Sequence, residues 1–194
     1  MSEILVTTVK HESATTDNIT LDTSGNVVIG GSVSAASGLG KVLQVLQTVK
    51  TDTFSTASLY PTFVGVTGLN VNITPSSTSS KILVMSSFGL NNSSASGHIF
   101  ANLNRGATKL FQPTIAGSQG LGSVALNYTA NYEQSIASFT FLDSPATTST
   151  INYSISVCVA ASGSAFVGQT GSDSNSDVNR SRLPSQITVM EIAG

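Results

Sequence analysis

Strict alternation of apolar and polar residues is the feature that most constrains the fold of this chain. In the stretch FVGVTGLNVNITP, Leu69, Val71 and Ile73 alternate with asparagines. The longest such run is INYSISVCVA, where apolar residues recur at every second position: Ile151, Tyr153, Ile155, Val157 and Val159. A period of two gives each face of a β-strand its own set of side chains, whereas a helix needs a period near 3.6. No long helical pattern follows residue 62, so this part of the sequence predicts strands.

Further segments extend this prediction. KILVMSSFGL (81–90) is apolar on both faces at its start and predicts a central strand. GHIFANLNRGATKLF (97–111) predicts two strands joined at Arg105-Gly106, and the segment 135–160 predicts a hairpin that turns at LDSPA. Six or more short strands separated by Gly, Pro, Ser and Asn turns are typical of an antiparallel sandwich or jelly roll. The predicted fold class is all-β, with a jelly-roll-like sandwich as head domain.

The segment KVLQVLQTVK (41–50) fits two patterns. Val42, Val45, Leu46 and Val49 fit one face of a helix, while Leu43, Val45 and Val49 fit one side of a strand. The segment is short, rich in β-branched residues and preceded by glycines. These features favour a strand.

A short hairpin is predicted ahead of the head domain, in DNITLDTSGNVVIGGS (17–32). A lone two-stranded hairpin is marginal in water, so its apolar residues need a partner in their own domain or in other copies of the chain. GSVSAASGLG (31–40) is a linker of small residues. We therefore divide the chain into an N-terminal anchor and hairpin with linker, 1–37, and a head domain, 38–194.

Composition excludes several classes of function. Charged residues make up only 9% of the chain, and polarity comes instead from 32 Ser and 23 Thr. A net charge of −2 offers no basic surface for nucleic acid, and there is no apolar run long enough for a membrane-spanning helix. The N-terminus is too short and polar for a signal peptide. The single cysteine, Cys158, excludes an intrachain disulfide framework.

The residues predict no catalytic or metal site. Asp143 lies in a Ser-Pro turn, and the loop with Asp173 and Asp177 lacks the ligand spacing of a calcium loop. His11 and His98 are far apart in the sequence, and no phosphate or nucleotide motif is present. We expect a protein that is not an enzyme and carries no metal and no cofactor.

Five stretches, in the same order, resemble a known family: GKVLQVLQTVKTDTFST, VTGLNVNITPSSTSSKILVM, RGATKLF, ASFTFLDSPATTSTINYSI and ITVMEIAG. They are similar to a C-terminal domain of tail fibre or fibre-like virion proteins from marine bacteriophages of the cyanophage and pelagiphage kind. The resemblance covers 38–194, and NITLDTSGNVVIGG resembles the β-structured stalk repeats of such fibres. It implies a homotrimer with jelly-roll-like heads.

The resemblance gives the N-terminal residues expected roles. Four residues of the hairpin would be buried between three copies of the chain, unless the hairpin folds back onto its own domain: Ile19, Leu21, Val27 and Ile29. The segment MSEILVTTVKHES would dock on the trimer's own stalk or on another virion protein, or form a first strand of the domain. Its candidate anchoring residues are Ile4, Val6, Val9 and His11.

Polar loops on a rigid β-scaffold are suited to binding a host cell-surface glycan. Three loops have this character: 89–97, 112–123 and 168–184. The candidate receptor-binding residues are Asn91, Asn92, Gln119, Tyr128, Asp173 and Asn175. Tyr128 and Tyr132 are expected near the second loop. The alternative is that all three are plain surface loops.

The predicted function is therefore a structural protein of a bacteriophage virion, a short homotrimeric tail fibre or tail tip that attaches by its N-terminus and binds a host receptor. The alternative is a capsid-bound head fibre, a decoration or cement protein, or a tail adaptor without a receptor role. A secreted adhesin is a third reading, disfavoured by the missing signal sequence. The expected location is the virion, after synthesis in the host cytoplasm.

Overall fold

The computed structural model describes residues 41–94, 97–114, 117–130, 132–173 and 176–194, with Thr8–Val9, Ile19–Leu21, Ser24 and Val27–Ile29 of the N-terminal part. The chain divides into two compact units, Met1–Leu39 and Gly40–Gly194. Every regular element in these described ranges is a β-strand. The predicted all-β fold class is confirmed.

The N-terminal unit contains one small antiparallel sheet in the order β1-β2-β3. Its strands are β1 (Thr8–Val9), β2 (Ile19–Leu21) and β3 (Val27–Ile29). Register places Ile19 opposite Ile29 and Leu21 opposite Val27, as in the predicted hairpin. β1 adds a strand along the other edge of β2.

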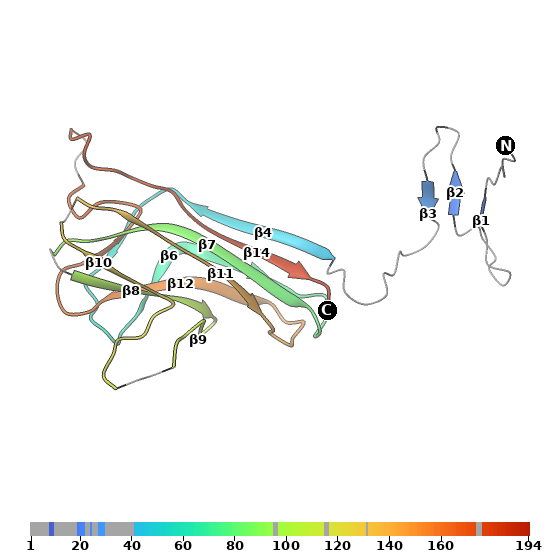
Figure 1. The fold of residues 1–194 in the computed structure, drawn as a ribbon, viewed down its shortest axis with the longest axis horizontal. Coiled ribbons are helices and arrows are strands. Elements are labelled where there is room, and N and C mark those ends of the chain that lie inside the picture. Colours follow the sequence, from blue (N-terminus) through green and yellow to red (C-terminus); the bar gives the residue numbers. More distant parts are fainter. Residues whose placement is uncertain are drawn as a thin grey trace, which may run out of the picture. The chain divides into compact units, whose positions relative to one another are not determined.

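The larger unit is a sandwich of two antiparallel sheets (Figure 1). One sheet has six strands in the order β4-β14-β7-β13-β5, with β11 along the other edge of β7. These strands are β4 (Val42–Lys50), β5 (Phe54–Thr56), β7 (Lys81–Asn92), β11 (Ser135–Asp143), β13 (Ala165–Val167) and β14 (Ser185–Ile192). The segments 41–50 and 81–90 thus form the strands predicted for them.

The second sheet has five strands. Four follow the order β10-β8-β12-β6, and β9 pairs with residues 103–105 of β8, beyond the part of β8 that pairs with β10. They are β6 (Val64–Ile73), β8 (Gly97–Arg105), β9 (Thr108–Leu110), β10 (Val124–Tyr128) and β12 (Ile151–Val159). β8 and β9 form the predicted hairpin at Arg105-Gly106, where Gly106 adopts a φ of 56° that favours glycine.

The hydrophobic core lies between the two sheets. The apolar residues predicted to face inward on β6 and β12 are all buried, including Leu69, Ile73 and Ile155. On β7, Phe88 packs edge-on against Phe139 of β11, with ring centroids 6.3 Å apart. Alternation in the sequence therefore identifies the core-facing residues.

The predicted hairpin around LDSPA is wrong. β11 pairs with β7 in the six-stranded sheet, whereas β12 pairs with β6 and β8 in the other sheet. The segment 144–150 therefore connects the two sheets. Alternation determines which face of a strand is buried. It does not determine which other strand lies beside it, because the same alternating pattern fits any neighbouring strand.

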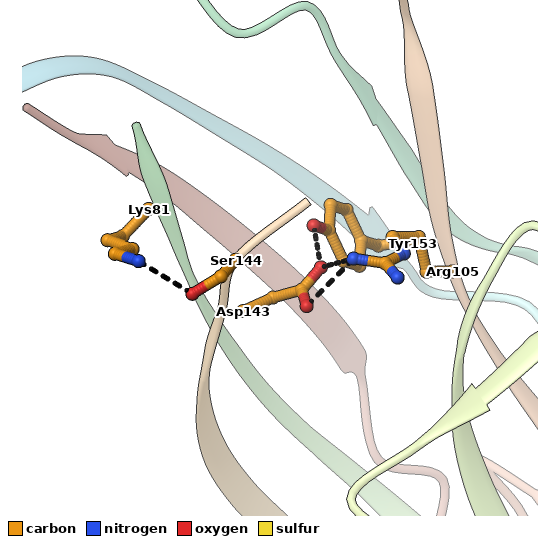
Figure 2. A network of polar contacts seen from close by, with 5 residues as sticks. All are labelled: Lys81, Arg105, Asp143, Ser144 and Tyr153. Atoms are coloured by element: carbon orange, nitrogen blue, oxygen red, sulfur yellow. Dashed lines mark hydrogen bonds and ion pairs between the residues drawn. The ribbon is translucent and has the colours of Figure 1, made fainter. Parts of the chain in front are cut away.

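A polar network links the two sheets where β11 ends (Figure 2). Asp143 accepts two hydrogen bonds from Arg105 Nη1, at 3.0 Å on Oδ1 and 2.9 Å on Oδ2. The buried Tyr153 hydroxyl donates to Asp143 Oδ2 at 2.6 Å. Burial, followed by the hydrogen bond and negative charge of Asp143, raises the pKa of Tyr153. Asp143 thus joins one strand of the six-stranded sheet to two strands of the other.

Candidate functional site

Three of the predicted receptor-binding residues lie inside the head domain. Asn91 and Asn92 end strand β7 and are fully buried, and Tyr128 is 1% exposed. The Asn91 amide donates to the Glu133 carbonyl, Asn92 Oδ1 accepts from the Ser94 amide at 2.8 Å, and the Tyr128 hydroxyl donates to the Leu90 carbonyl at 2.7 Å. The prediction that these three residues lie on receptor-binding loops is therefore wrong. Their side chains are buried and form hydrogen bonds with backbone groups of the head domain, so they are not available to a receptor.

Two other candidates lie on the surface. Gln119 and Asp173 are exposed, while Asn175 lies outside the described residues. Asp173 accepts a hydrogen bond from Arg182 Nε at 3.1 Å, and the hydrogen bonds and charge of Arg182 lower the pKa of Asp173. A role for Gln119 or Asp173 in receptor binding stays a prediction.

The candidates in the N-terminal unit fall partly within the described residues. Ile4, Val6 and His11 lie outside them, and Val9 belongs to β1. The four predicted trimer-contact residues belong to β2 and β3: Ile19, Leu21, Val27 and Ile29. Their anchoring and trimer-contact roles stay predictions.

A pocket of about 320 Å³ lies between the 168–184 loop and Tyr132. Its lining residues are Tyr132, Asp177, Asn179 and Arg180. Tyr132 is 56% exposed, and the Arg180 guanidinium lies 5.6 Å from the centre of the ring. The site thus combines an accessible aromatic ring with a cation, a carboxylate and an amide.

The loop carrying this pocket is organised by Asp177. Asp177 Oδ1 accepts hydrogen bonds from the backbone amide of Asn179 at 2.9 Å and from Asn179 Nδ2 at 3.0 Å. Arg180 Nε forms an ion pair with Asp177 Oδ2 at 3.2 Å. The backbone hydrogen bond of Asn179, together with the other contacts of Asp177, lowers the pKa of its carboxyl. Asp177 therefore stays ionised and holds Arg180 in place.

The Arg180 side chain is mostly buried, with 20% of its surface exposed. Its Nη1 atom is buried and makes no hydrogen bond within the described part of the chain. A guanidinium has five N–H donors, and a buried donor without an acceptor is costly. Because Nη1 is buried, a ligand in the pocket would meet the exposed part of the guanidinium and the face of the Tyr132 ring.

Sequence reasoning missed this combination. Tyr132 was expected near the 112–123 loop, whereas the structure places it beside Arg180 of the 168–184 loop. The sequence Asp177-x-Asn179-Arg180 does predict a local turn, because an aspartate side chain in a turn commonly accepts a hydrogen bond from the backbone two residues further along. The proximity of Tyr132 depends on tertiary structure.

Other buried polar groups serve the fold. Glu191 is 1% exposed and accepts hydrogen bonds from Ser76, Ser80 and Gln44 at 2.6–2.7 Å. Burial raises the pKa of Cys158 to about 11, so this thiol is protonated at neutral pH.

Among the residues that the structure describes there is no group of three or more side chains suited to hold a metal ion. Nor does the described part include a helix long and apolar enough to cross a membrane.

No protein-family model and no curated protein matches the sequence. Among solved structures, the chain is similar to a chain of infectious bursal disease virus, Gt strain, with 14% identity and a TM-score of 0.39 over 91% of this chain and 48% of that one. It is also similar to the VP2 subviral particle of infectious bursal disease virus, with 13% identity and a TM-score of 0.36 over 89% of this chain and 43% of that one. The chain spans less than half the length of these proteins. Likeness at such TM-scores carries no argument about function.

Proposed function

We propose that this chain is a bacteriophage virion structural protein, a short homotrimeric fibre that attaches by its N-terminal segment and binds a host surface glycan through its head. The observation that carries the receptor role is the pocket of Tyr132 and Arg180, which offers an exposed ring face beside a partly exposed cation. The phage assignment rests on the resemblance of 38–194 to marine phage fibre proteins.

The trimeric part of the proposal is supported by the size of the N-terminal sheet. Its three strands have two or three residues each. Sheets this small lack independent stability in water unless they pack against something. Packing three copies around one axis would supply that partner.

Native mass tests the trimer. The full chain is expected to run as a trimer in size-exclusion chromatography with light scattering, and Ile29→Asp is expected to dissociate it, because a charge would be buried at the shared axis. Thr20→Ser in β2 is the conservative control. A monomeric full chain would contradict the trimer and favour a decoration or adaptor protein that awaits a virion partner.

Adsorption tests the receptor role. Fluorescently labelled full chain is expected to bind marine cyanobacterial cells saturably. Tyr132→Ala is expected to weaken binding at least tenfold, because the exposed Tyr132 ring would be covered by the bound ligand, and aromatic residues covered on binding contribute much of the affinity. Tyr132→Phe keeps the ring and should bind within a few-fold of the unmodified chain. Equal adsorption of the Tyr132→Ala variant would remove the pocket from the proposal. No adsorption at all would favour the structural alternative, a head fibre, decoration protein or adaptor.

A further inference from the structure

The pocket of Tyr132 and Arg180 is close to electrically neutral, although it contains a guanidinium. Asp177 Oδ2 lies 3.2 Å from Arg180 Nε, so the one cation and the one anion among the lining residues compensate each other. In the same loop, Asp173 forms an ion pair with Arg182. An acidic ligand therefore meets guanidinium groups that already have a carboxylate partner.

A further carboxylate shifts the balance towards negative charge. Glu133 follows Tyr132 in the chain and is exposed. Its carboxylate accepts hydrogen bonds from the Thr129 backbone amide at 3.1 Å and from Thr129 Oγ1 at 2.9 Å, and within the described ranges it has no ion-pair partner. An anionic group bound on Tyr132 would lie close to this uncompensated charge, and like charges oppose binding.

Two side chains of the pocket keep hydrogen-bonding groups that the loop does not use. A carboxylate has about four acceptor positions. Asp177 Oδ1 accepts two bonds from Asn179, Oδ2 lies beside Arg180, and 38% of the Asp177 side chain is exposed. The exposed Asn179 amide uses one N–H of Nδ2 for Asp177 and keeps its second N–H and its carbonyl oxygen. A carboxylate and an amide are thus held side by side.

This pair of side chains matches two neighbouring hydroxyl groups of a sugar. A hydroxyl both donates and accepts, so one hydroxyl can donate to Asp177 while its neighbour accepts from the Asn179 N–H. A hydrogen bond to an ionised carboxylate is about twice as strong as one between neutral groups. The Tyr132 ring, 56% exposed, offers an apolar surface to the C–H face of the same sugar.

The volume of the pocket restricts the ligand to a small unit. About 320 Å³ is at the lower end of the range for ligand pockets, about 300–1,000 Å³. One sugar ring fits this volume, and any further sugar of a longer glycan would lie outside it.

We propose that the pocket recognises one uncharged sugar ring through two adjacent hydroxyl groups, which bind Asp177 and Asn179, and that it discriminates against acidic sugars. The inference rests on the proposed function and gives its receptor a chemical class. Asp177 then has two tasks, because it holds Arg180 in place and also contacts the ligand. Since one ring fills the pocket, a terminal or branching sugar of a host glycan fits best.

Saturation-transfer NMR of the full chain tests this inference without cells. The probes are the methyl glycosides of glucose, galactose and mannose, each beside the methyl glycoside of its own uronic acid, which differs by a carboxylate at C6. At least one neutral glycoside is expected to bind. Its uronic counterpart is expected to bind about tenfold more weakly or not at all, because it brings a like charge towards Glu133 and Asp177. Equal or tighter binding of the uronic acid would overturn the uncharged ligand.

Asp177→Asn tests the contact with the carboxylate. It removes the charge-assisted hydrogen bond and is expected to weaken binding of the neutral glycoside by about tenfold or more. Asp52→Asn is the matched control, because Asp52 is an exposed carboxyl that pairs with Lys50 and does not line the pocket. It should leave the affinity for the glycoside unchanged, and circular dichroism establishes that both variants keep their strands. Unchanged affinity of Asp177→Asn would contradict the contact.

Because Asp177 also holds the loop, a second test leaves the protein unmodified and changes the ligand. Mono-O-methyl derivatives of the bound glycoside block one hydroxyl at a time. Blocking either of two adjacent hydroxyls is expected to weaken binding by about tenfold or more, because the buried polar partners are then left unpaired. Binding that tolerates methylation at every position would overturn the hydrogen-bonded pair.

The outcomes separate this inference from the proposed function. If no neutral glycoside binds although Tyr132→Ala abolishes adsorption to cells, the sugar class is wrong and the receptor role of the pocket stands. If a neutral glycoside binds through Asp177 while Tyr132→Ala leaves adsorption unchanged, the sugar class stands and the receptor role is wrong. Absence of both effects overturns both.

Discussion

Replacing Asp143 with alanine is expected to lower the free energy of unfolding by about 3 kcal/mol. The carboxylate accepts two hydrogen bonds from Arg105 and one from Tyr153. Without it, the fully buried Tyr153 hydroxyl has no acceptor, and an orphaned buried donor costs about 1–3 kcal/mol. The loss of charge-assisted bonds to Arg105 adds to this. Urea unfolding at pH 7 measures the effect.

An exposed ion pair in the same molecule provides the control. Asp173→Ala removes the partner of Arg182, which lies at the surface, and pairs of this kind contribute little to stability. The double variant Asp143→Ala with Tyr153→Phe should be less destabilised than the sum of the two single variants, because it removes the orphaned hydroxyl. Similar midpoints for Asp143→Ala and Asp173→Ala would contradict a structural role for the network.

Much of the fold is predictable because buried faces impose a period of two on the sequence. Leu69, Ile73 and Ile155 point into the core as their alternation predicts. The neighbour of each strand was not predictable, since β11 would show the same pattern beside β12 as it shows beside β7. Pairing depends on contacts between residues far apart in the chain.

The same limit explains the misplaced site residues. Asn91, Asn92 and Tyr128 were expected in recognition loops, yet they are buried and form hydrogen bonds with backbone groups of the head domain. A polar side chain that binds a receptor and one that satisfies a buried carbonyl look alike in sequence. Conversely, Val45 and Val49 fit the apolar side of a strand but are exposed. Hydrophobicity predicts that a residue will be covered; it does not say whether its own chain or another one covers it.

Acidification is expected to remove a contribution to stability made by Glu191. Burial opposes ionisation of this carboxyl, but the hydrogen bonds from Ser76, Gln44 and Ser80 outweigh it and lower the pKa from its usual 4.5 to about 2. The folded state therefore binds the proton less tightly than the unfolded chain does. By linkage, the contribution is complete above about pH 5 and is lost as the pH falls from 4.5 to 2.

The variant Glu191→Gln isolates this contribution. The amide keeps the size of the side chain but cannot accept the same set of hydrogen bonds, so the variant should be less stable than the unmodified protein by about 1–3 kcal/mol at pH 7. Thermal unfolding between pH 7 and pH 2 should show the difference shrinking below pH 4.5, because the protonated glutamic acid comes to resemble the amide. Gln119→Asn, at an exposed residue that does not titrate, is the control, with no comparable change expected. A difference that stays constant down to pH 2 would mean that Glu191 is not held ionised by these three side chains.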